Sequence, residues 1–204
     1  MNTKKYSMSF VGGALFHQES VRLAELYLKK GDWNEVRDDV IAKNLLQART
    51  SSSAKRICRE ICSRLKRLNK DELELLVEGD HQEQAYLLWI AVCRHHLFIY
   101  EFSAEVIRER FLTLRHDLSY EDFDAFFNAK MEWHEELERV TPTTRNKLRQ
   151  VLFRMLREAE ILSSDNSIIP ATLSSRLINV VCSHSSRDLR LFPIMEAALQ
   201  ECAK

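Results

Sequence analysis

The chain has 204 residues, of which 45% are hydrophobic and 29% are charged, and its 30 basic residues balance its 30 acidic ones. This composition can bury a core, so it excludes a disordered chain. Only four glycines and three prolines interrupt a sequence that is rich in good helix formers. We therefore predict an all-α protein, a compact bundle of about nine or ten helices.

The sequence offers no membrane or export signal. Its longest apolar run, Ala85 to Cys93, is too short to span a bilayer. Residues 1–10 lack the pattern of a signal peptide. Five cysteines, an odd number without Cys-x-x-Cys spacing, are typical of free thiols in a reducing compartment. We expect a cytoplasmic protein that does not contact a membrane.

Apolar spacing and capping residues divide the chain into predicted elements. Residues 1–13 are predicted to form a flexible or extended lead-in that ends at Gly12-Gly13. Gly31 is expected to end the first helix, and Asp32 to cap the second. The predicted helices cover residues 15–30, 32–41, 51–68, 70–78, 80–100, 103–115, 120–137, 142–159, 172–181 and 193–203.

A change of pattern follows the predicted helix 142–159. Residues 161–169 predict a small hairpin around Asp165-Asn166. A helix followed by a short hairpin is the arrangement of a winged-helix protein. We expect residues 14–204 to form a single helical domain. The alternative is a division near residues 101–140 into an N-terminal bundle and a C-terminal winged-helix-like part.

Positive charge is concentrated in two stretches. Seven basic residues and one acid lie between Arg49 and Arg67, and five basic residues and no acid lie between Thr141 and Arg157. Each stretch begins in a Ser/Thr cluster and continues with helical spacing. A helix N-terminus followed by a basic face favours phosphate groups, so the two stretches predict nucleic-acid binding.

In the first basic helix, Ile57, Ile61 and Leu65 share one side of a helical wheel, and the cations lie opposite. Arg64 lies nearer the packed side. The candidate phosphate contacts of this stretch are Arg49, Ser51, Ser52, Lys55, Arg56, Arg59, Lys66 and Arg67.

In the second basic helix, Leu148, Leu152 and Met155 form the packed stripe, and Arg145 and Arg149 lie near its edge. In the winged-helix interpretation, Asn146 and Gln150 reach base edges. The alternative for both helices is a solvated face, or one that pairs with the acidic stretches of this same chain. The candidate contacts here are Thr144, Asn146, Lys147, Gln150, Arg154 and Arg157.

Catalytic and metal-binding motifs are missing from the sequence, which has no His-Glu-x-x-His, no Gly-x-Ser-x-Gly and no phosphate-binding glycine loop. His95 and His96 are adjacent, so we expect them to point to different helix faces. Cys58 and Cys62 are more simply buried core thiols than two ligands of a metal. We expect no enzyme activity, no catalytic residue, no cofactor and no metal.

Three blocks of the chain resemble one known family. Residues 6–15, 44–56 and 148–157 are similar to the corresponding parts of BrxA proteins, and the length and helical character agree over essentially the whole chain. BrxA is the small component of bacteriophage-exclusion (BREX) defence systems, and its family is described as NusB-like. The resemblance implies a cytoplasmic, non-catalytic, nucleic-acid-binding accessory protein in phage defence.

We therefore predict an accessory protein that binds double-stranded DNA mainly through phosphate contacts from the two basic helices. One alternative is an RNA-binding protein of the NusB type. Another is a scaffold whose acidic and basic faces dock other components of the defence complex.

Overall fold

The computed structural model describes residues 5–195, and in this range the chain is helical without a named strand, which confirms the all-α prediction. Two short 3₁₀ helices and one π-helical turn complete the order: η1 (Ser9–Gly12), η3 (Ser186–Leu191) and the π-helical η2 (Ser103–Ile107). The α-helices are α1 (His17–Lys30), α2 (Trp33–Ala42), α3 (Ser51–Leu65), α4 (Lys70–Glu78), α5 (His81–His95), α6 (Leu97–Phe102), α7 (Arg108–Leu112), α8 (Tyr120–Met131), α9 (Glu135–Glu138), α10 (Pro142–Glu158) and α11 (Ser175–Ser185).

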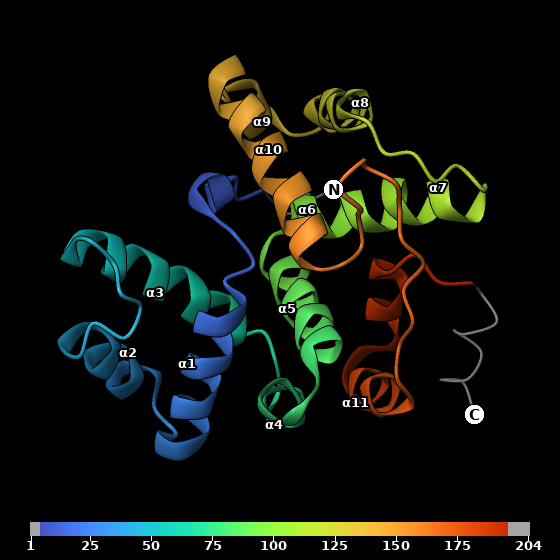
Figure 1. The fold of residues 1–204 in the computed structure, drawn as a ribbon. Helices are drawn as coiled ribbons and strands as arrows, with labels where there is room; N and C mark the ends of the chain where they lie inside the picture. The colour runs from blue at the N-terminus through green and yellow to red at the C-terminus, as the bar shows by residue number, and fades with distance from the viewer. Residues whose placement is uncertain (1–4, 196–204) are drawn as a thin grey trace.

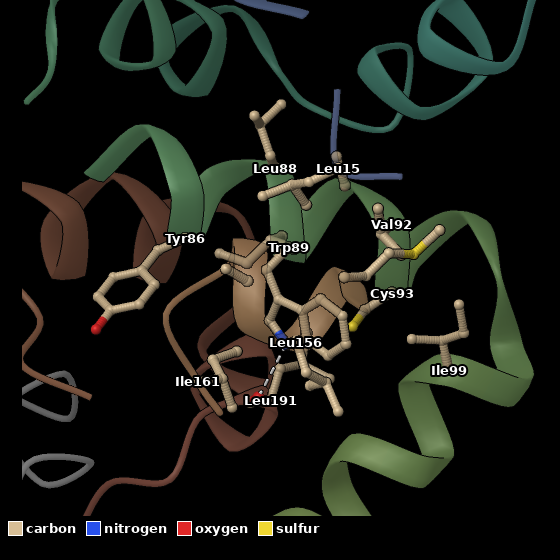
Figure 2. Packing of buried hydrophobic residues seen from close by; sticks show 14 of the residues in the cluster. Leu15, Tyr86, Leu88, Trp89, Val92, Cys93, Ile99, Leu156, Ile161 and Leu191 are labelled. Atoms are coloured by element: carbon tan, nitrogen blue, oxygen red, sulfur yellow. Dashed lines mark hydrogen bonds between the residues drawn. The ribbon is translucent and has the colours of Figure 1, made fainter. Parts of the chain in front are cut away.

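Helix α5 is the centre of the fold. Figure 1 shows α1, α2 and α3 to one side of it, α11 to the other, and α6 to α10 beyond its C-terminal end. Every side chain from Ala85 to Cys93 is buried. In Figure 2 the Trp89 ring lies among apolar side chains, and its Nε1 donates a hydrogen bond to the Leu191 carbonyl at 3.2 Å. The apolar run that is too short for a membrane therefore fills the core. Among the described helices, none combines the length and the hydropathy that a membrane span needs.

Several predicted helix ends are confirmed by their caps. Gly31 adopts a left-handed conformation with φ of 75° at the end of α1, and the Asp32 carboxylate caps α2. Asn69, Asp80 and Ser119 each form a reciprocal capping box at the start of α4, α5 and α8. These ends were predictable because each depends on residues within one helical turn.

The prediction of one helix over residues 80–100 is wrong. Helix α5 ends at His95, and His96 is extended with φ of −114° and ψ of 97°. A second helical run then begins at Leu97 and continues through η2 to Leu112. The His96 ring is fully buried, with Nε2 3.1 Å from the Glu60 carboxylate of α3. A tertiary contact accompanies this break.

Likewise, the predicted helix 120–137 is interrupted at residues 132–134.

The two ends of the chain differ from expectation. Within the predicted flexible or extended lead-in, Tyr6 and Phe10 are buried and η1 forms at Ser9–Gly12, so this part of the segment is anchored to the core, whereas residues 5–8 form no helix. Of the predicted final helix 193–203, residues 193–195 are not helical and the rest lies outside the described residues.

The predicted hairpin is present in reduced form. Leu162 and Ile168 form one isolated antiparallel bridge, and Asp117 and Ser167 form another. Between Leu162 and Ile168 the chain turns, and Asn166 adopts a positive φ of 67° in this turn.

The cysteines follow the expectation in part. Cys58, Cys62 and Cys93 are free and buried. Cys182 is disulfide-bonded, so the expectation of free thiols is wrong there.

A buried charge cluster joins α4, α5 and η3. The Arg94 guanidinium lies 2.6 Å from Glu72 and 2.8 Å from Asp188, and both carboxylates are almost completely buried. Arg94 also donates to the Arg67 carbonyl at the end of α3. These bonds satisfy charges that would be costly to bury alone.

Replacing Arg94 with alanine should lower the free energy of unfolding by about 3–5 kcal/mol, because it leaves Glu72 buried without its partner. Urea denaturation measures this loss. Arg176→Ala removes the exposed pair with Glu78 and should cost less than about 1 kcal/mol. Equal losses in the two variants would contradict the role given to the buried cluster.

Candidate nucleic-acid interface

Helix α3 presents a basic face to solvent. The Thr50 hydroxyl caps the helix by accepting a bond from the Ser53 amide at 3.2 Å, one residue before the predicted start. Ala54, Cys58, Ile61 and Leu65 are buried, which leaves the cations opposite. All the predicted contacts of this stretch are exposed: Arg49, Ser51, Ser52, Lys55, Arg56, Arg59, Lys66 and Arg67.

We call Lys55, Arg56, Arg59, Lys66 and Arg67 the α3 basic face. Among the described residues, none of these five side chains has an ion-pair partner. Arg56 makes one long bond, from Nη1 to the Gly12 carbonyl at 3.4 Å. Arg64 differs, because it is buried and lies 2.8 Å from Glu60. The α3 basic face therefore carries positive charge that makes no direct ion pair with an acid among the described residues.

The arginines of α10 bond mostly to groups of the protein itself, and three of the four are half-buried. Arg145 Nε lies 2.9 Å from the Asp124 carboxylate of α8, and Arg149 donates to the same carboxylate. Their guanidinium groups also lie 4.5 Å from the Phe127 ring and 4.6 Å from the Tyr120 ring. The alternative that basic residues pair with acidic stretches of this chain holds for these two.

The predicted contacts on α10 are only partly available. Arg157 is half-buried and donates to Asn166 at 2.6 Å, and Arg154 donates to the Gly13 carbonyl. The Thr144 hydroxyl is used in the cap, where it accepts from Thr141 at 2.9 Å. Asn146, Lys147 and Gln150 remain exposed, and Asn146 accepts a bond from Arg149 at 3.3 Å. On α10, the structure thus supports a smaller basic surface than the sequence predicts.

The two basic helices meet at the segment Gly12–Ala14. Arg56 of α3 donates to the Gly12 carbonyl, Arg154 of α10 to the Gly13 carbonyl, and Arg64 of α3 to the Ala14 carbonyl at 2.5 Å. Figure 1 shows this stretch, just after η1, running between the two helices. Arg56 and Arg154 are both exposed, and they donate to neighbouring carbonyls of this segment.

The two glycines of this segment lie close to neighbouring atoms, and at Gly13 one of these atoms belongs to the backbone. A Cβ on Gly12 would lie 2.2 Å from Arg56 Nη1. A Cβ on Gly13 would lie 2.6 Å from Met155 Cε and 3.0 Å from the Phe10 carbonyl.

Residues 97–169 contain the segment for which the sequence suggested a winged helix. Helical residues 97–112 precede a short extended segment, then come α8 and α10, and finally the hairpin turn. The Ile168 amide donates to the His116 carbonyl at 2.6 Å, and the Leu118 amide to Asn166 at 2.9 Å. However, exposed Asp165 lies on the turn, and α9 is acidic. Negative charge close to α10 disfavours a nucleic-acid contact there.

A group that could hold a metal lies under the C-terminal end of α5. One atom each of Glu60, His95 and His96 lies within 4.8 Å of the others. The expectation that adjacent histidines point apart is wrong here, because the helix ends between them. Arg64 already pairs with the same carboxylate at 2.8 Å. The positive charge of Arg64 on the Glu60 carboxylate disfavours a metal ion at these three residues.

The fold and its surface define an all-α protein with a segregated cationic face. The chain belongs to the BrxA family, whose model matches residues 4–185. It is 29% identical over 158 residues to the BREX protein BrxA of Escherichia coli O9:H4 (strain HS), covering 78% of this chain and 74% of the relative. It is also 29% identical to the BREX protein BrxA of Bacillus cereus (strain H3081.97), over 64% of this chain and 65% of the relative.

One solved structure shares the fold. It is the crystal structure of an uncharacterized protein from Magnetospirillum magneticum, with a TM-score of 0.81 and 20% sequence identity, covering 93% of this chain and all of that one. At this identity the likeness concerns the fold alone.

The buried end of α5 predicts an acid-sensitive stability. Burial and the neighbouring His96 lower the pKa of His95 to about 4, whereas an unfolded histidine has a pKa of about 6.5. The unfolded chain therefore binds more protons between these values, and the free energy of unfolding falls as the pH drops through them. His95→Gln should lose less stability than the wild type between about pH 7 and about pH 5, measured by urea denaturation.

The exposed His184 of α11 provides the control. His184→Gln should keep the pH dependence of the wild type. If His95→Gln also keeps it, the acid sensitivity does not arise from His95.

Proposed function

We propose that this BrxA family member is a component of a BREX phage-exclusion system and binds double-stranded DNA through phosphate contacts from the α3 basic face. The observation that carries the proposal is a set of five exposed cations, three on α3 and two just after its last residue, without ion-pair partners among the described residues. The names of the relatives, BREX protein BrxA, support the place in phage defence.

The dimensions of the α3 basic face suit a phosphate backbone. From Lys55 to Lys66 the chain advances about 17 Å along the helix axis, over which one DNA strand presents about five phosphates. Ser51 and Ser52 add hydroxyl groups at the positive end of the helix dipole. Such contacts fix the protein on a duplex without reading its bases. Lys147 and Arg154 extend the surface along α10, beyond the contact at Gly12–Ala14.

The α3 basic face favours a duplex over single-stranded RNA. Proteins that bind single strands stack the bases on exposed aromatic side chains. The exposed large aromatic residues of the described chain, Tyr120 and Trp133, belong to α8 and the turn after it. The α3 basic face itself has Lys and Arg, and no aromatic residue.

A second candidate function, docking a protein of the defence complex, has its own observation. Trp133 is 76% exposed, and it lies beside exposed Glu132 and Glu135. A large apolar side chain that is exposed to solvent is typical of a protein–protein interface. Tryptophan is enriched among the residues that contribute most of the binding energy of such interfaces. The acidic surroundings would suit a basic partner surface.

Reversing three charges of the α3 basic face should abolish most duplex binding. Lys55→Glu, Arg56→Glu and Arg59→Glu together replace three phosphate contacts with repulsion, which we expect to weaken binding at least about 100-fold. A mobility-shift titration on a DNA duplex measures the affinity, and circular dichroism confirms that the variant stays helical.

A variant with the same change of net charge provides the control. The control triple variant changes three exposed arginines of α11 and η3: Arg176→Glu, Arg187→Glu and Arg190→Glu. It should bind the duplex nearly as well as the wild type. Equal loss in both triple variants would mean that net charge, rather than the α3 basic face, controls binding. Preferential competition by single-stranded RNA would instead support the RNA alternative.

Replacing Trp133 with alanine should separate the two candidate functions. It should leave duplex binding unchanged, because Trp133 lies outside the α3 basic face. If the second candidate is correct, the variant should no longer co-purify with other proteins of the defence system after nuclease treatment. Retention of every such partner by Trp133→Ala would contradict docking at this residue.

A further inference from the structure

Two free thiols lie against each other on the helix that carries the basic face. Cys58 Sγ and Cys62 Sγ are 3.9 Å apart, one turn apart on α3, and both residues are buried. Cys58 also lines a cavity of about 540 Å³ between α2 and α3. Of the two thiols, Cys58 is the one at the wall of this cavity, although its side chain is almost completely buried.

The surroundings of Cys58 favour its thiolate, which is the reactive form of cysteine. Arg37, Lys55 and Arg59 line the same cavity, with Asp38 as the one acid. The hydrogen bond with Cys62 lowers the pKa of Cys58, and the charge of Arg37 acts in the same direction against the effect of burial. The hydrogen bond with Cys58 and burial raise the pKa of Cys62, so the second thiol keeps its proton. The two thiols therefore have different chemical roles.

We propose that Cys58 and Cys62 form an oxidisable dithiol that a hydroperoxide converts into a disulfide within α3. In the first step the Cys58 thiolate attacks the peroxide, the O–O bond breaks, and Cys58 becomes a sulfenic acid while an alcohol or water leaves with one added proton. In the second step Cys62 attacks that sulfur, loses its proton and releases water. Two thiols lose two electrons in total, and the peroxide is reduced by the same two.

The disulfide changes the shape of α3. Residues four apart on a helix have Cβ atoms about 5–6 Å apart, whereas a disulfide needs about 3.5–4.5 Å. The helix must therefore distort around Cys58, and a strained disulfide of this kind is easily reduced. Lys55 and Arg59 lie within a turn of Cys58, so the distortion moves two cations of the α3 basic face. This consequence, unlike the oxidation itself, rests on the proposed function.

Peptide mapping tests the chemistry without any DNA. The full chain is treated with hydrogen peroxide, free thiols are blocked, and the protein is digested with trypsin. Cleavage after Arg59 places Cys58 in the peptide Ile57–Arg59 and Cys62 in Glu60–Arg64. We expect these two peptides to be joined by a disulfide that dithiothreitol reverses.

Two internal comparisons make this test specific. The Cys62→Ser variant should stop at the sulfenic acid, which dimedone labels on Cys58. Cys93 is as buried as Cys58 and also lines a cavity, but burial raises the pKa of its thiol, so it should react more slowly than Cys58 in the folded protein. The proposal is overturned if the two peptides remain unlinked, or if Cys58 reacts no faster than Cys93.

A duplex-binding titration before and after oxidation tests the consequence. Oxidised wild type should bind about tenfold more weakly, comparable to one lost charged hydrogen bond, and Cys58→Ser should not respond to peroxide. Unchanged affinity of a protein shown to be linked would overturn the effect on binding. Absence of duplex binding by the reduced protein would instead overturn the proposed function and leave the dithiol assignment intact.

Discussion

Three arginines that hold the segment Gly12–Ala14 between α3 and α10 determine how the basic surface is arranged. Arg56, Arg64 and Arg154 donate to three consecutive carbonyls, so backbone from the N-terminal segment joins the two helices. Buried Arg64 must satisfy its charge internally, which it does with Glu60 and the Ala14 carbonyl. Because Ile61 and Leu65 pack inward beside it, the remaining cations of α3 point outward. The α3 basic face is thus a consequence of how the core is built.

Sequence reasoning predicted the helices that are fixed locally and missed the breaks that depend on distant contacts. The boundaries at Gly31, Asp32 and Asn69 follow from caps, which involve residues one turn apart. The break at His96 has no such signal, because its ring is buried against Glu60, 36 residues earlier in the chain. In the same way, burial of Tyr6 and Phe10 depends on surfaces that form only in the folded protein.

The candidate site was predictable to different extents on its two helices. The amphipathic pattern of α3 was sufficient to identify every exposed cation, because its apolar stripe determines which side faces water. On α10 the same reasoning placed Arg145 and Arg149 near the packed edge but could not identify their partner, Asp124, which lies 21 and 25 residues away. Pairing between a basic and an acidic stretch is a tertiary property. The fold therefore leaves α3 with more free charge than α10.

Charge segregation is the basis on which we propose that a chain with zero net charge binds a polyanion. The acids near α10 lie on α8, α9 and the hairpin turn, and Glu158 of α10 itself lies 3.7 Å from Arg154, whereas the five cations of the α3 basic face have no ion-pair partner among the described residues. The most direct test is the affinity of the wild-type protein for duplex DNA across a range of salt concentrations. If these five cations neutralise five phosphates, the logarithm of the association constant should fall with the logarithm of salt concentration with a slope of about −4.5. A slope near zero, or no binding at low salt, would contradict the account.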